Sequence, residues 1–338
     1  MTMQIKEARK ILSLGFVGVG WIGKNRMEAI VKSGIGRASL IYDSSADSAA
    51  AASEVSPEAK LALDSSEVLD NSLLDGVVIA TPSALHAEQA LQALNNNLAV
   101  FCQKPLGRNA AEVQELIEAS EKADRLLAVD LSYRYTEAFQ AIHSLITSGD
   151  IGKVYAVDLV FHNAYGPDKS WFYDIKQSGG GCVMDLGTHL IDLAMWTLDF
   201  PETEVVNRSL YSKGKLLQKH EEQVEDFASV NLLTSCGTSI SLQCSWNVSA
   251  GCDAVIEAKF YGTNGGAAFK NLNGSFYDFT AEKYNGTNSQ TLVSPPDEWS
   301  GRAGVVWAER VAEGCGFDRK SAIEFLKTAQ IIDSIYGR

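Results

Sequence analysis

Short apolar runs alternate with helical patterns between residues 12 and 125 of the 338-residue chain. The runs lack a period of two, as Val77, Val78 and Ile79 show, which is typical of strands buried on both faces of a sheet. This order predicts a parallel sheet with helices on both faces. The runs lie at residues 13–19, 38–42, 76–80, 99–102 and 126–131, and the helical patterns between them include residues 86–95 and 110–123.

After residue 130 the pattern changes to longer segments in which apolar and polar residues alternate. Alternation at a period of two predicts a sheet with one buried face. Asn-Gly and Gly-Gly pairs favour the tight turns of antiparallel hairpins. We therefore expect an α/β protein of two domains, residues 1–129 and residues 130–338, with a mostly antiparallel sheet in the second. The alternating segments lie at residues 155–161, 227–233, 238–246 and 254–261, and the turns at 264–266, 273–274 and 285–286.

Composition narrows the class of protein. Hydrophobic residues make up 46% and charged residues 21%, as in ordinary globular proteins. A net charge of −13 would repel nucleic acid and anionic membranes, which favours a small neutral partner. No apolar run is long enough for a membrane span and residues 1–10 are polar, so we expect a cytoplasmic protein. The six cysteines show neither a CxxC pair nor metal-ligand spacing, which predicts reduced thiols and no metal site.

A glycine motif follows the first apolar run. Gly18, Gly20 and Gly23 enclose Trp21 and Ile22 and lead directly into a helical stretch. In this context the glycines permit a tight turn, close approach to a pyrophosphate and close packing of helix on strand, while the helix N-terminus attracts the phosphates. The motif therefore predicts a dinucleotide site, the alternative being a glycine-rich turn without a ligand.

Asp43 lies twenty residues after Gly23, at the end of the next apolar run. A carboxylate there would accept hydrogen bonds from both ribose hydroxyls and would repel a 2′-phosphate. Ser44 and Ser45 supply no compensating cation, so NAD is favoured over NADP. Alternatively, Asp43 only caps the following helix.

Further candidates lie where the later runs end, because ligands of open α/β sheets bind at the carboxyl edge. Thr81 and Pro82 end one run, and His86 follows either as a cofactor contact or as a packing residue. Gln103 and Lys104 end the next, where a lysine could exchange a proton with a substrate hydroxyl. Taken alone, Lys104 is also compatible with an ordinary surface lysine.

A second constellation follows the glycine run 179–181. Asp185, His189 and Asp192 stand at i, i+4 and i+7 and so share one stripe of a helix that is otherwise apolar. Buried ionisable groups are costly unless they are paired or used, and a carboxylate one turn from an imidazole can orient a general base. A core His–Asp pair or a metal site are the alternatives, and Asp192 could equally be an orienting or a structural residue.

An aromatic segment precedes the glycine run. Trp171 could lie against the C–H groups of a sugar, and Asp174 could bind a hydroxyl. Packing at a domain interface explains the segment equally well. Histidines 143, 162 and 220 show no partner pattern and are expected to be structural.

Together the motifs GVGWIG, TPSALH, QKP and GGGCVMDLGTHLID resemble the glucose-fructose oxidoreductase, inositol dehydrogenase and MocA family. The resemblance covers about residues 12–200. It implies a Rossmann domain followed by an α/β domain whose large open sheet makes homodimer or homotetramer contacts. It also implies hydride transfer between a nicotinamide and a sugar or polyol carbon.

The resemblance also assigns roles. His189 corresponds to the family's usual proton acceptor, and Lys104 and Asp185 to the residues that hold substrate hydroxyls. Arg134 resembles an arginine in a segment near the nicotinamide. The departures are Gln103 for the usual glutamate, Ser132 for a frequent asparagine and Glu137 for a frequent proline.

We therefore expect an NAD-dependent oxidoreductase that acts on a secondary alcohol of a sugar, polyol or derivative, with Lys104, Asp185 and His189 at its centre. Two rivals remain. One is a redox-assisted hydrolase or epimerase that keeps its NAD tightly bound. The other is a dinucleotide-binding regulator without catalysis, which would have no need of a proton acceptor.

Overall fold

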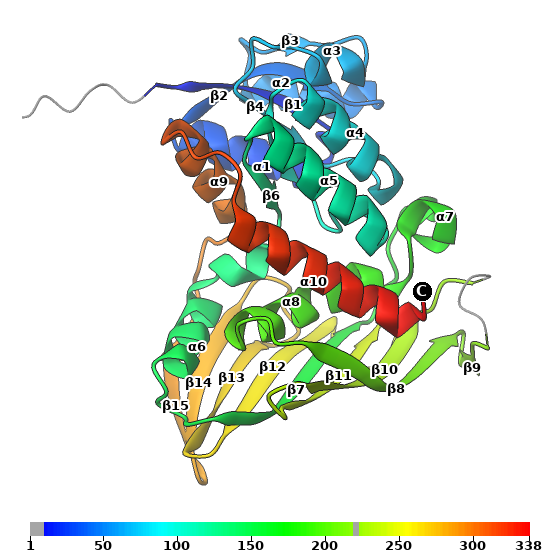
Figure 1. The fold of residues 1–338 in the computed structure, drawn as a ribbon, viewed down its shortest axis with the longest axis vertical. Coiled ribbons are helices and arrows are strands. Elements are labelled where there is room, and N and C mark those ends of the chain that lie inside the picture. Colours follow the sequence, from blue (N-terminus) through cyan, green and yellow to red (C-terminus); the bar gives the residue numbers. More distant parts are fainter. Residues whose placement is uncertain (1–9, 219–222) are drawn as a thin grey trace, which may run out of the picture.

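The computed structural model describes residues 10–218 and 223–338 (Figure 1). Most of the polar N-terminus and His220 therefore lie outside the described residues. Two sheets stand one above the other in Figure 1, and a long C-terminal helix runs between them. In the part of the chain that is described, no helix is both long and apolar enough to cross a membrane.

The upper sheet is parallel, as the sequence predicts. Its strands follow the order β3-β2-β1-β4-β5-β6, and every residue of β4 and β5 is buried. The strands are β1 (Leu12–Val17), β2 (Gly36–Tyr42), β3 (Lys60–Leu61), β4 (Gly76–Ile79), β5 (Ala99–Cys102) and β6 (Leu127–Val129). The helices that connect them are α1 (Trp21–Lys32), α2 (Ala46–Val55), α3 (Ser65–Leu69), α4 (Ser83–Asn95) and α5 (Ala110–Ala123).

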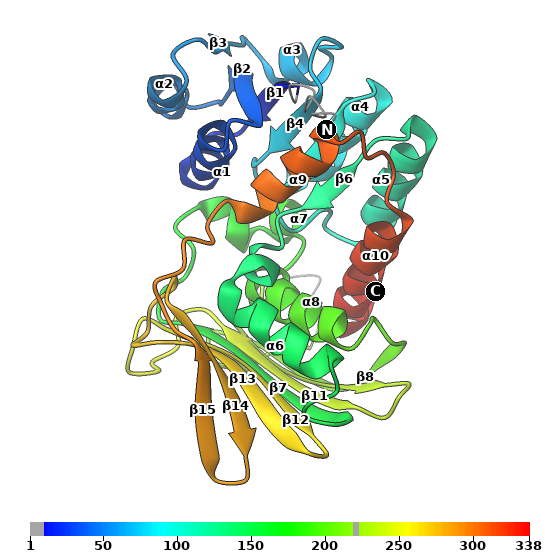
Figure 2. The ribbon, with the colours of Figure 1, turned by 90° about the vertical axis from the view of Figure 1, so that its left-hand side faces the viewer.

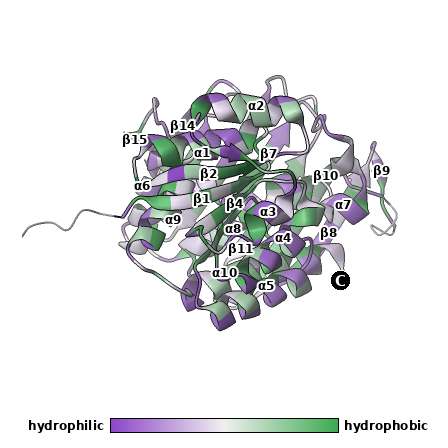
Figure 3. Ribbon diagram, turned by 90° about the horizontal axis from the view of Figure 1, so that it is seen from above, coloured by the Kyte–Doolittle hydropathy of each residue, from purple (hydrophilic) through white to green (hydrophobic). Residues whose placement is uncertain are grey.

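Helix α5 illustrates how the sequence forms these helices. Asn109 caps its N-terminus by accepting a hydrogen bond from the backbone N–H of Glu112 at 2.9 Å. Val113, Leu116 and Ile117 then form a buried face at helical spacing. Helices around the sheet accordingly carry hydrophobic and hydrophilic residues side by side (Figure 3).

The lower sheet has nine strands in the order β15-β14-β13-β12-β7-β11-β10-β8-β9. Within this sheet, only the β7–β11 pair is parallel among the pairings of the described residues, so the expectation of a mostly antiparallel sheet is confirmed. The strands are β7 (Val154–Asn163), β8 (Thr203–Ser212), β9 (Lys215–Leu216), β10 (Phe227–Thr234), β11 (Ser239–Ser245), β12 (Ala254–Gly262), β13 (Gly265–Asn271), β14 (Phe279–Asn285) and β15 (Asn288–Val293).

One face of this sheet carries the core. Ala228, Val230 and Leu232 of β10 are buried, while the residues between them face the other side, which explains the period of two. Helices α6 (Glu137–Thr147) and α8 (Thr188–Thr197) cover the buried face, and no described element covers the opposite face (Figures 1 and 2). Short helical turns complete the chain: η1 (Ser132–Tyr135), η2 (Ser170–Tyr173), α7 (Ile175–Ser178) and η3 (Val183–Gly187).

The last two helices return to the N-terminal sheet. In α9 (Arg302–Ala312), Trp307 is 2% exposed and its ring lies 5.8 Å from that of Phe101, in the same core as Leu14. Helix α10 (Arg319–Tyr336) contacts α5 of the upper region and α8 and β8 of the lower one. Residues from 302 onward thus link the two sheets.

We expect Trp307→Ala to lower the free energy of unfolding by about 3–5 kcal/mol, because it leaves a large cavity between α9 and the parallel sheet. Urea unfolding measured by circular dichroism checks this. Ile323→Ala, at a side chain that is 49% exposed, is the control and should change stability by less than about 0.5 kcal/mol. A similar small loss for both variants would show that α9 contributes little to this core.

Candidate active site

The glycine motif forms a cradle at the carboxyl edge of the parallel sheet. Gly18 has φ +81°, and a Cβ there would lie 2.6 Å from the carbonyl carbon of Ala80. A Cβ on Gly23 would lie 1.9 Å from the carbonyl oxygen of Gly18. A Cβ on Gly20, in contrast, would meet nothing within 4 Å, and α1 begins one residue later. The cradle therefore fits a dinucleotide, with open space and free N–H groups where a pyrophosphate would lie.

Asp43 is hydrogen-bonded to this cradle. Its Oδ2 accepts a hydrogen bond from the Val19 N–H at 2.7 Å and its Oδ1 from the Ser45 N–H at 2.8 Å. The side chain that caps α2 is that of Ser45, which accepts from the Ser48 N–H. Asp43 thus holds the ends of β1 and β2 together. Each carboxylate oxygen retains a lone pair, and Ser44 beside it is exposed.

His86 is 1% exposed and bridges two loops of the sheet edge. Its Nε2 lies 2.7 Å from the carbonyl oxygen of Thr81, and its Nδ1 lies 2.7 Å from that of Pro105. Burial lowers the pKa of the imidazole below its usual value, although both carbonyl contacts oppose this. Since both ring nitrogens contact the protein, His86 links the Thr81-Pro82 loop to the loop that carries Lys104.

Gln103 lies beside a buried ion pair. Arg26 donates from Nε to Asp130 Oδ2 at 2.6 Å, and Gln103 donates from Nε2 to the same oxygen at 2.7 Å. Asp130 is fully buried and Arg26 is 5% exposed. A glutamate at position 103 would place a second carboxylate against Asp130, which is unfavourable at this distance. The neighbouring aspartate thus gives a physical reason for glutamine at this position.

Lys104 follows a strand of the upper sheet, and its side chain reaches Asp185 of the lower region. Its Nζ donates to Oδ1 of Asp185 at 2.6 Å and to the backbone oxygen of the same residue at 2.7 Å. The other oxygen, Oδ2, accepts from Nε1 of Trp246 at 3.1 Å. Both side chains of the ion pair are 16% exposed, so the pair faces solvent only at one side.

His189 lies near this pair but is not joined to it. No hydrogen bond connects His189 with Asp185 among the described residues, and Nδ1 of His189 is buried without a partner there. The expected orientation of His189 by Asp185 is therefore not what the structure shows. The physical reason is that η3 is a π-turn in which the Thr188 N–H reaches back five residues to Val183, which breaks the regular i, i+4 stripe.

The surroundings keep His189 uncharged. Burial lowers the pKa of its imidazole well below the usual value, and the positive charges of Lys104 and Arg26 lower it further. The ring of Tyr133 packs edge-on against it at 4.8 Å between centroids. A neutral imidazole of this kind can accept a proton at neutral pH.

Asp192 belongs to a different group. Arg134 donates from Nε and Nη2 to its two carboxylate oxygens at 2.7 and 2.6 Å, and from Nη1 to Glu324 at 2.6 Å. The two carboxylates raise the pKa of the guanidinium of Arg134, although burial opposes this. This cluster joins η1, α8 and α10, so it fixes the position of the helix that carries His189. The guanidinium of Arg134, which the resemblance placed near the nicotinamide, thus donates hydrogen bonds to Asp192 and Glu324.

The aromatic segment forms one rim of the site. Trp171 stacks on Phe172 with ring centroids 3.8 Å apart, and Tyr173 packs edge-on against Trp246 at 5.6 Å. Asp174 caps α7 by accepting from the Lys176 N–H. Beyond this rim a groove of about 840 Å³ extends over the outward-facing side chains of β8, β10 and β11. Its lining includes Tyr173, Tyr211, Phe227, Trp246, Asn247 and Gln243.

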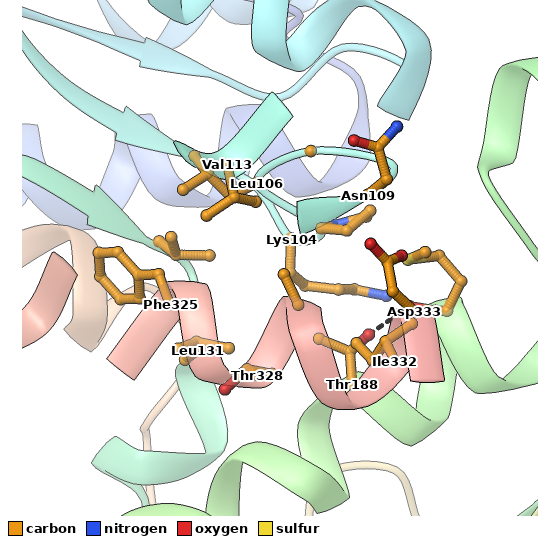
Figure 4. Close-up of a pocket in the computed structure, with 15 residues that line it drawn as sticks. Lys104, Leu106, Asn109, Val113, Leu131, Thr188, Phe325, Thr328, Ile332 and Asp333 are labelled. Carbon is orange, nitrogen blue, oxygen red and sulfur yellow. Dashed lines mark hydrogen bonds between the residues drawn. The ribbon is translucent and has the colours of Figure 1, made fainter. Parts of the chain in front are cut away.

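A smaller cavity of about 40 Å³ lies behind Lys104, between α5 and α10 (Figure 4). Leu106, Val113, Leu131, Phe325 and Ile332 make it apolar. At this volume it is too small to hold a sugar, so it is packing space behind the lysine stem.

Sequence reasoning missed four residues of the site: Arg26, Tyr133, Asp130 and Trp246. Their partners lie far apart in the chain, for instance 104 residues for Arg26 and Asp130. Only Asp130 carried a signal, since it directly follows a buried run at the carboxyl edge of the sheet. His143 stacks on Trp196, whereas His162 contacts Ser245 and lies against Phe227 of the groove. No group of three or more metal-ligating side chains occurs within residues 10–218 and 223–338.

The fold and the cradle define a dinucleotide-binding protein with a separate sheet domain, and comparison with known proteins places it more closely. Residues 12–131 match the oxidoreductase family with an NAD-binding Rossmann fold, and residues 139–268 match the GFO/IDH/MocA C-terminal domain. The chain belongs to the Gfo/Idh/MocA family of oxidoreductases, as its motifs predicted.

Several curated relatives are sugar or polyol enzymes. D-glucoside 3-dehydrogenase of Escherichia coli (strain K12) is 29% identical over 41% of this chain and 40% of its own length. Inositol 2-dehydrogenase of Salmonella typhimurium is 29% identical over 56% of this chain and 55% of its own. 1,5-Anhydro-D-fructose reductase of Ensifer adhaerens is 26% identical over 57% and 58%. The alignments thus span about half the length of these relatives.

Solved structures share the whole fold. Levoglucosan dehydrogenase, in complex with NADH and levoglucosan, has a TM-score of 0.81 and 21% identity over 96% of each chain. A mutant 3-ketoreductase from Actinomadura kijaniata, in complex with TDP-benzene and NADP, has a TM-score of 0.83 and 18% identity over 96% and 97% of the two chains. At such identities the likeness shows the fold alone.

We expect Arg134→Met to destabilise the protein by about 3–5 kcal/mol, because it leaves the buried carboxylates of Asp192 and Glu324 without their cation. Chemical unfolding measures the loss. Lys24→Met, which removes an exposed 3.8 Å pair with Glu28, should cost less than about 0.5 kcal/mol. An Arg134→Met protein of normal stability that binds NAD poorly would instead assign Arg134 to the cofactor.

Proposed function

We propose that the protein is an NAD-dependent dehydrogenase that acts on a secondary alcohol of a sugar, polyol or sugar derivative. One observation carries the proposal: the Lys104–Asp185 ion pair lies close to an uncharged His189, at the sheet edge that also holds the dinucleotide cradle. Family membership and the sugar and polyol activities of the named relatives support the reaction class.

In this proposal Lys104, Asp185 and His189 each have a separate role. Nζ of Lys104 donates a hydrogen bond to the reacting hydroxyl oxygen, and Asp185 accepts one from a neighbouring hydroxyl. His189 takes the proton of the reacting hydroxyl as the carbon–hydrogen bond breaks. The nicotinamide cofactor, when bound, accepts the hydride from that carbon in oxidation. These charges are already in place before the substrate arrives, so little reorganisation is needed during the reaction.

The groove suggests where the rest of the substrate lies. Trp246 borders both the groove and Asp185, because its indole donates to that carboxylate, and Tyr173 packs against Trp246. Aromatic faces with amide groups such as those of Asn247 and Gln243 suit the C–H and O–H groups of a neutral saccharide. Trp171 and Asp174 remain candidates at the rim.

We further propose that copies of the chain associate through the face of the nine-stranded sheet that no described element covers. The bare face of this wide sheet supports the proposal, because a two-fold contact between copies would cover the same face on both.

Asp43 should make the protein prefer NAD over NADP by about 1–3 kcal/mol, because its carboxylate would accept ribose hydroxyls and repel a 2′-phosphate. Calorimetric titration with both cofactors measures the preference, and Asp43→Ala should reduce it. Asp47→Ala, in the first turn of α2, is the matched control and should change nothing. Tighter binding of NADP by the wild type would contradict this role for Asp43.

His189→Ala should reduce turnover by roughly 100-fold or more and leave NAD affinity nearly unchanged. Because the pKa of His189 is lowered, its neutral form persists at neutral pH, so kcat/KM for oxidation should fall only when the pH drops below the usual histidine range of about 6.5. The variant should lose this acid limb. An equal loss of NAD binding would place His189 in the cofactor site.

Lys104→Met should lower kcat/KM by about 3 kcal/mol or more, since the two side chains are similar in length but methionine cannot donate to a hydroxyl. The assay is NADH formation over a panel of sugars, inositols and sugar acids. NAD affinity, read by titration, should be preserved. Near-normal turnover of Lys104→Met would refute the proposed chemistry, whereas Lys24→Met should behave as wild type.

A further inference from the structure

The helix that carries Asp185 begins with a row of backbone N–H groups that have no partner inside the helix. The first N–H to bond within it is that of Asp185, which donates to the carbonyl of Gly181 at 3.0 Å. The N–H groups of residues 181–184 precede it. Helix starts generally leave such groups to water or to capping side chains, and here Gly181, Val183 and Met184 are buried.

Glu225 satisfies three of these groups. Its Oε2 accepts from the Gly181 N–H at 3.0 Å and its Oε1 from the Val183 N–H at 2.9 Å. Its backbone carbonyl accepts from the Cys182 N–H at 3.1 Å. Glu225 is fully buried, 44 residues away from Gly181 in the chain.

Tyr336, at the end of α10, completes the arrangement. Its hydroxyl donates to Oε1 of Glu225 at 2.8 Å and accepts from the N–H groups of Gly181 and Met184, each at 3.1 Å. A hydroxyl has one hydrogen and two lone pairs, so these three bonds use it completely. Every N–H from 181 to 184 therefore has a partner on Glu225 or Tyr336.

The glycine run is the complement of these two residues. A Cβ on Gly180 would lie 2.1 Å from the Tyr336 hydroxyl oxygen, and a Cβ on Gly181 would lie 1.9 Å from the carbonyl oxygen of Glu225. In the structure these glycines are closely packed, because only glycine lets the backbone approach both partners.

Burying the carboxyl group of Glu225 in this cap costs free energy. Burial raises the pKa of the Glu225 carboxyl, while its bonds to backbone N–H groups and to Tyr336 oppose that change. A carboxylate at a helix start is favourable only because the N–H groups and the helix dipole face it. Asp185 is the next residue after the capped groups, and its carboxylate holds Lys104.

We infer that Glu225 and Tyr336 are positioning residues that fix the turn Val183–Gly187 and thereby keep Asp185 on Lys104. Neither touches the reacting groups. The effect on turnover rests on the function proposed above, whereas the effect on the Lys104–Asp185 pair does not. The last helix of the chain thus takes part in the geometry of the site.

The test compares Tyr336→Phe with Thr280→Val. Each change removes one buried hydroxyl, and the Thr280 hydroxyl donates to the Val293 carbonyl at 2.7 Å in β14, towards the far edge of the nine-stranded sheet. The first readout is the rate at which acetic anhydride acylates Lys104, measured by mass spectrometry against Lys24 as internal reference. A loosened pair exposes the amine, so Tyr336→Phe should raise this rate several-fold and Thr280→Val should not.

The second readout is the split between kcat and KM on the substrate found by the screen. Tyr336→Phe should lower kcat roughly 10- to 100-fold, because small displacements of catalytic groups are costly, and should leave KM for NAD unchanged. Glu225→Gln, which keeps the size but not the charge, should act in the same direction. Unchanged Lys104 acylation in Tyr336→Phe, with a loss of thermal stability like that of Thr280→Val, would overturn the inference. If the wild type oxidises no substrate, the proposed function fails, while the acylation rate still decides the role of Tyr336.

Discussion

The ion pair between Lys104 and Asp185 connects the two halves of the molecule at the point where the chemistry is proposed. Lys104 comes from the edge of the parallel sheet and Asp185 from a helix that lies on the nine-stranded sheet. A distance of 2.6 Å between groups on different sheets requires that both sheets be held in fixed relative positions. The returning helices α9 and α10 provide this, since one packs into the upper core and the other spans both regions.

Several buried charges surround that pair, and each has its own compensation. Asp130 neutralises Arg26, while Asp192 and Glu324 neutralise Arg134. Burial lowers the pKa of the His189 imidazole, and the nearby charges of Lys104 and Arg26 lower it further, so the ring is uncharged. Among the described residues no carboxylate is hydrogen-bonded to the Nδ1 atom of this imidazole, so nothing there favours its charged form.

The relatives show how far such a fold is preserved while details change. Structures with 18% and 21% identity superimpose over nearly the whole chain, yet one was solved with NADP and the other with NADH. The fold alone therefore does not determine which of the two cofactors binds. In this chain Asp43 accepts a hydrogen bond from the backbone of the glycine cradle, and Gln103 donates one to Asp130.

The sequence by itself determined both sheets and the dinucleotide cradle, because strand burial, helix periodicity and glycine spacing are local properties of the chain. It also brought Lys104, Asp185 and His189 to attention, since each stands in a motif at a strand end or on an apolar helix. The tertiary structure alone decided how they are arranged. A π-turn separates Asp185 from His189, and Asp192 is hydrogen-bonded to Arg134. Glu225 and Tyr336 reach the helix start from 44 and 155 residues beyond Gly181. Such contacts depend on which segments packing brings together, and no period or spacing along the chain records that.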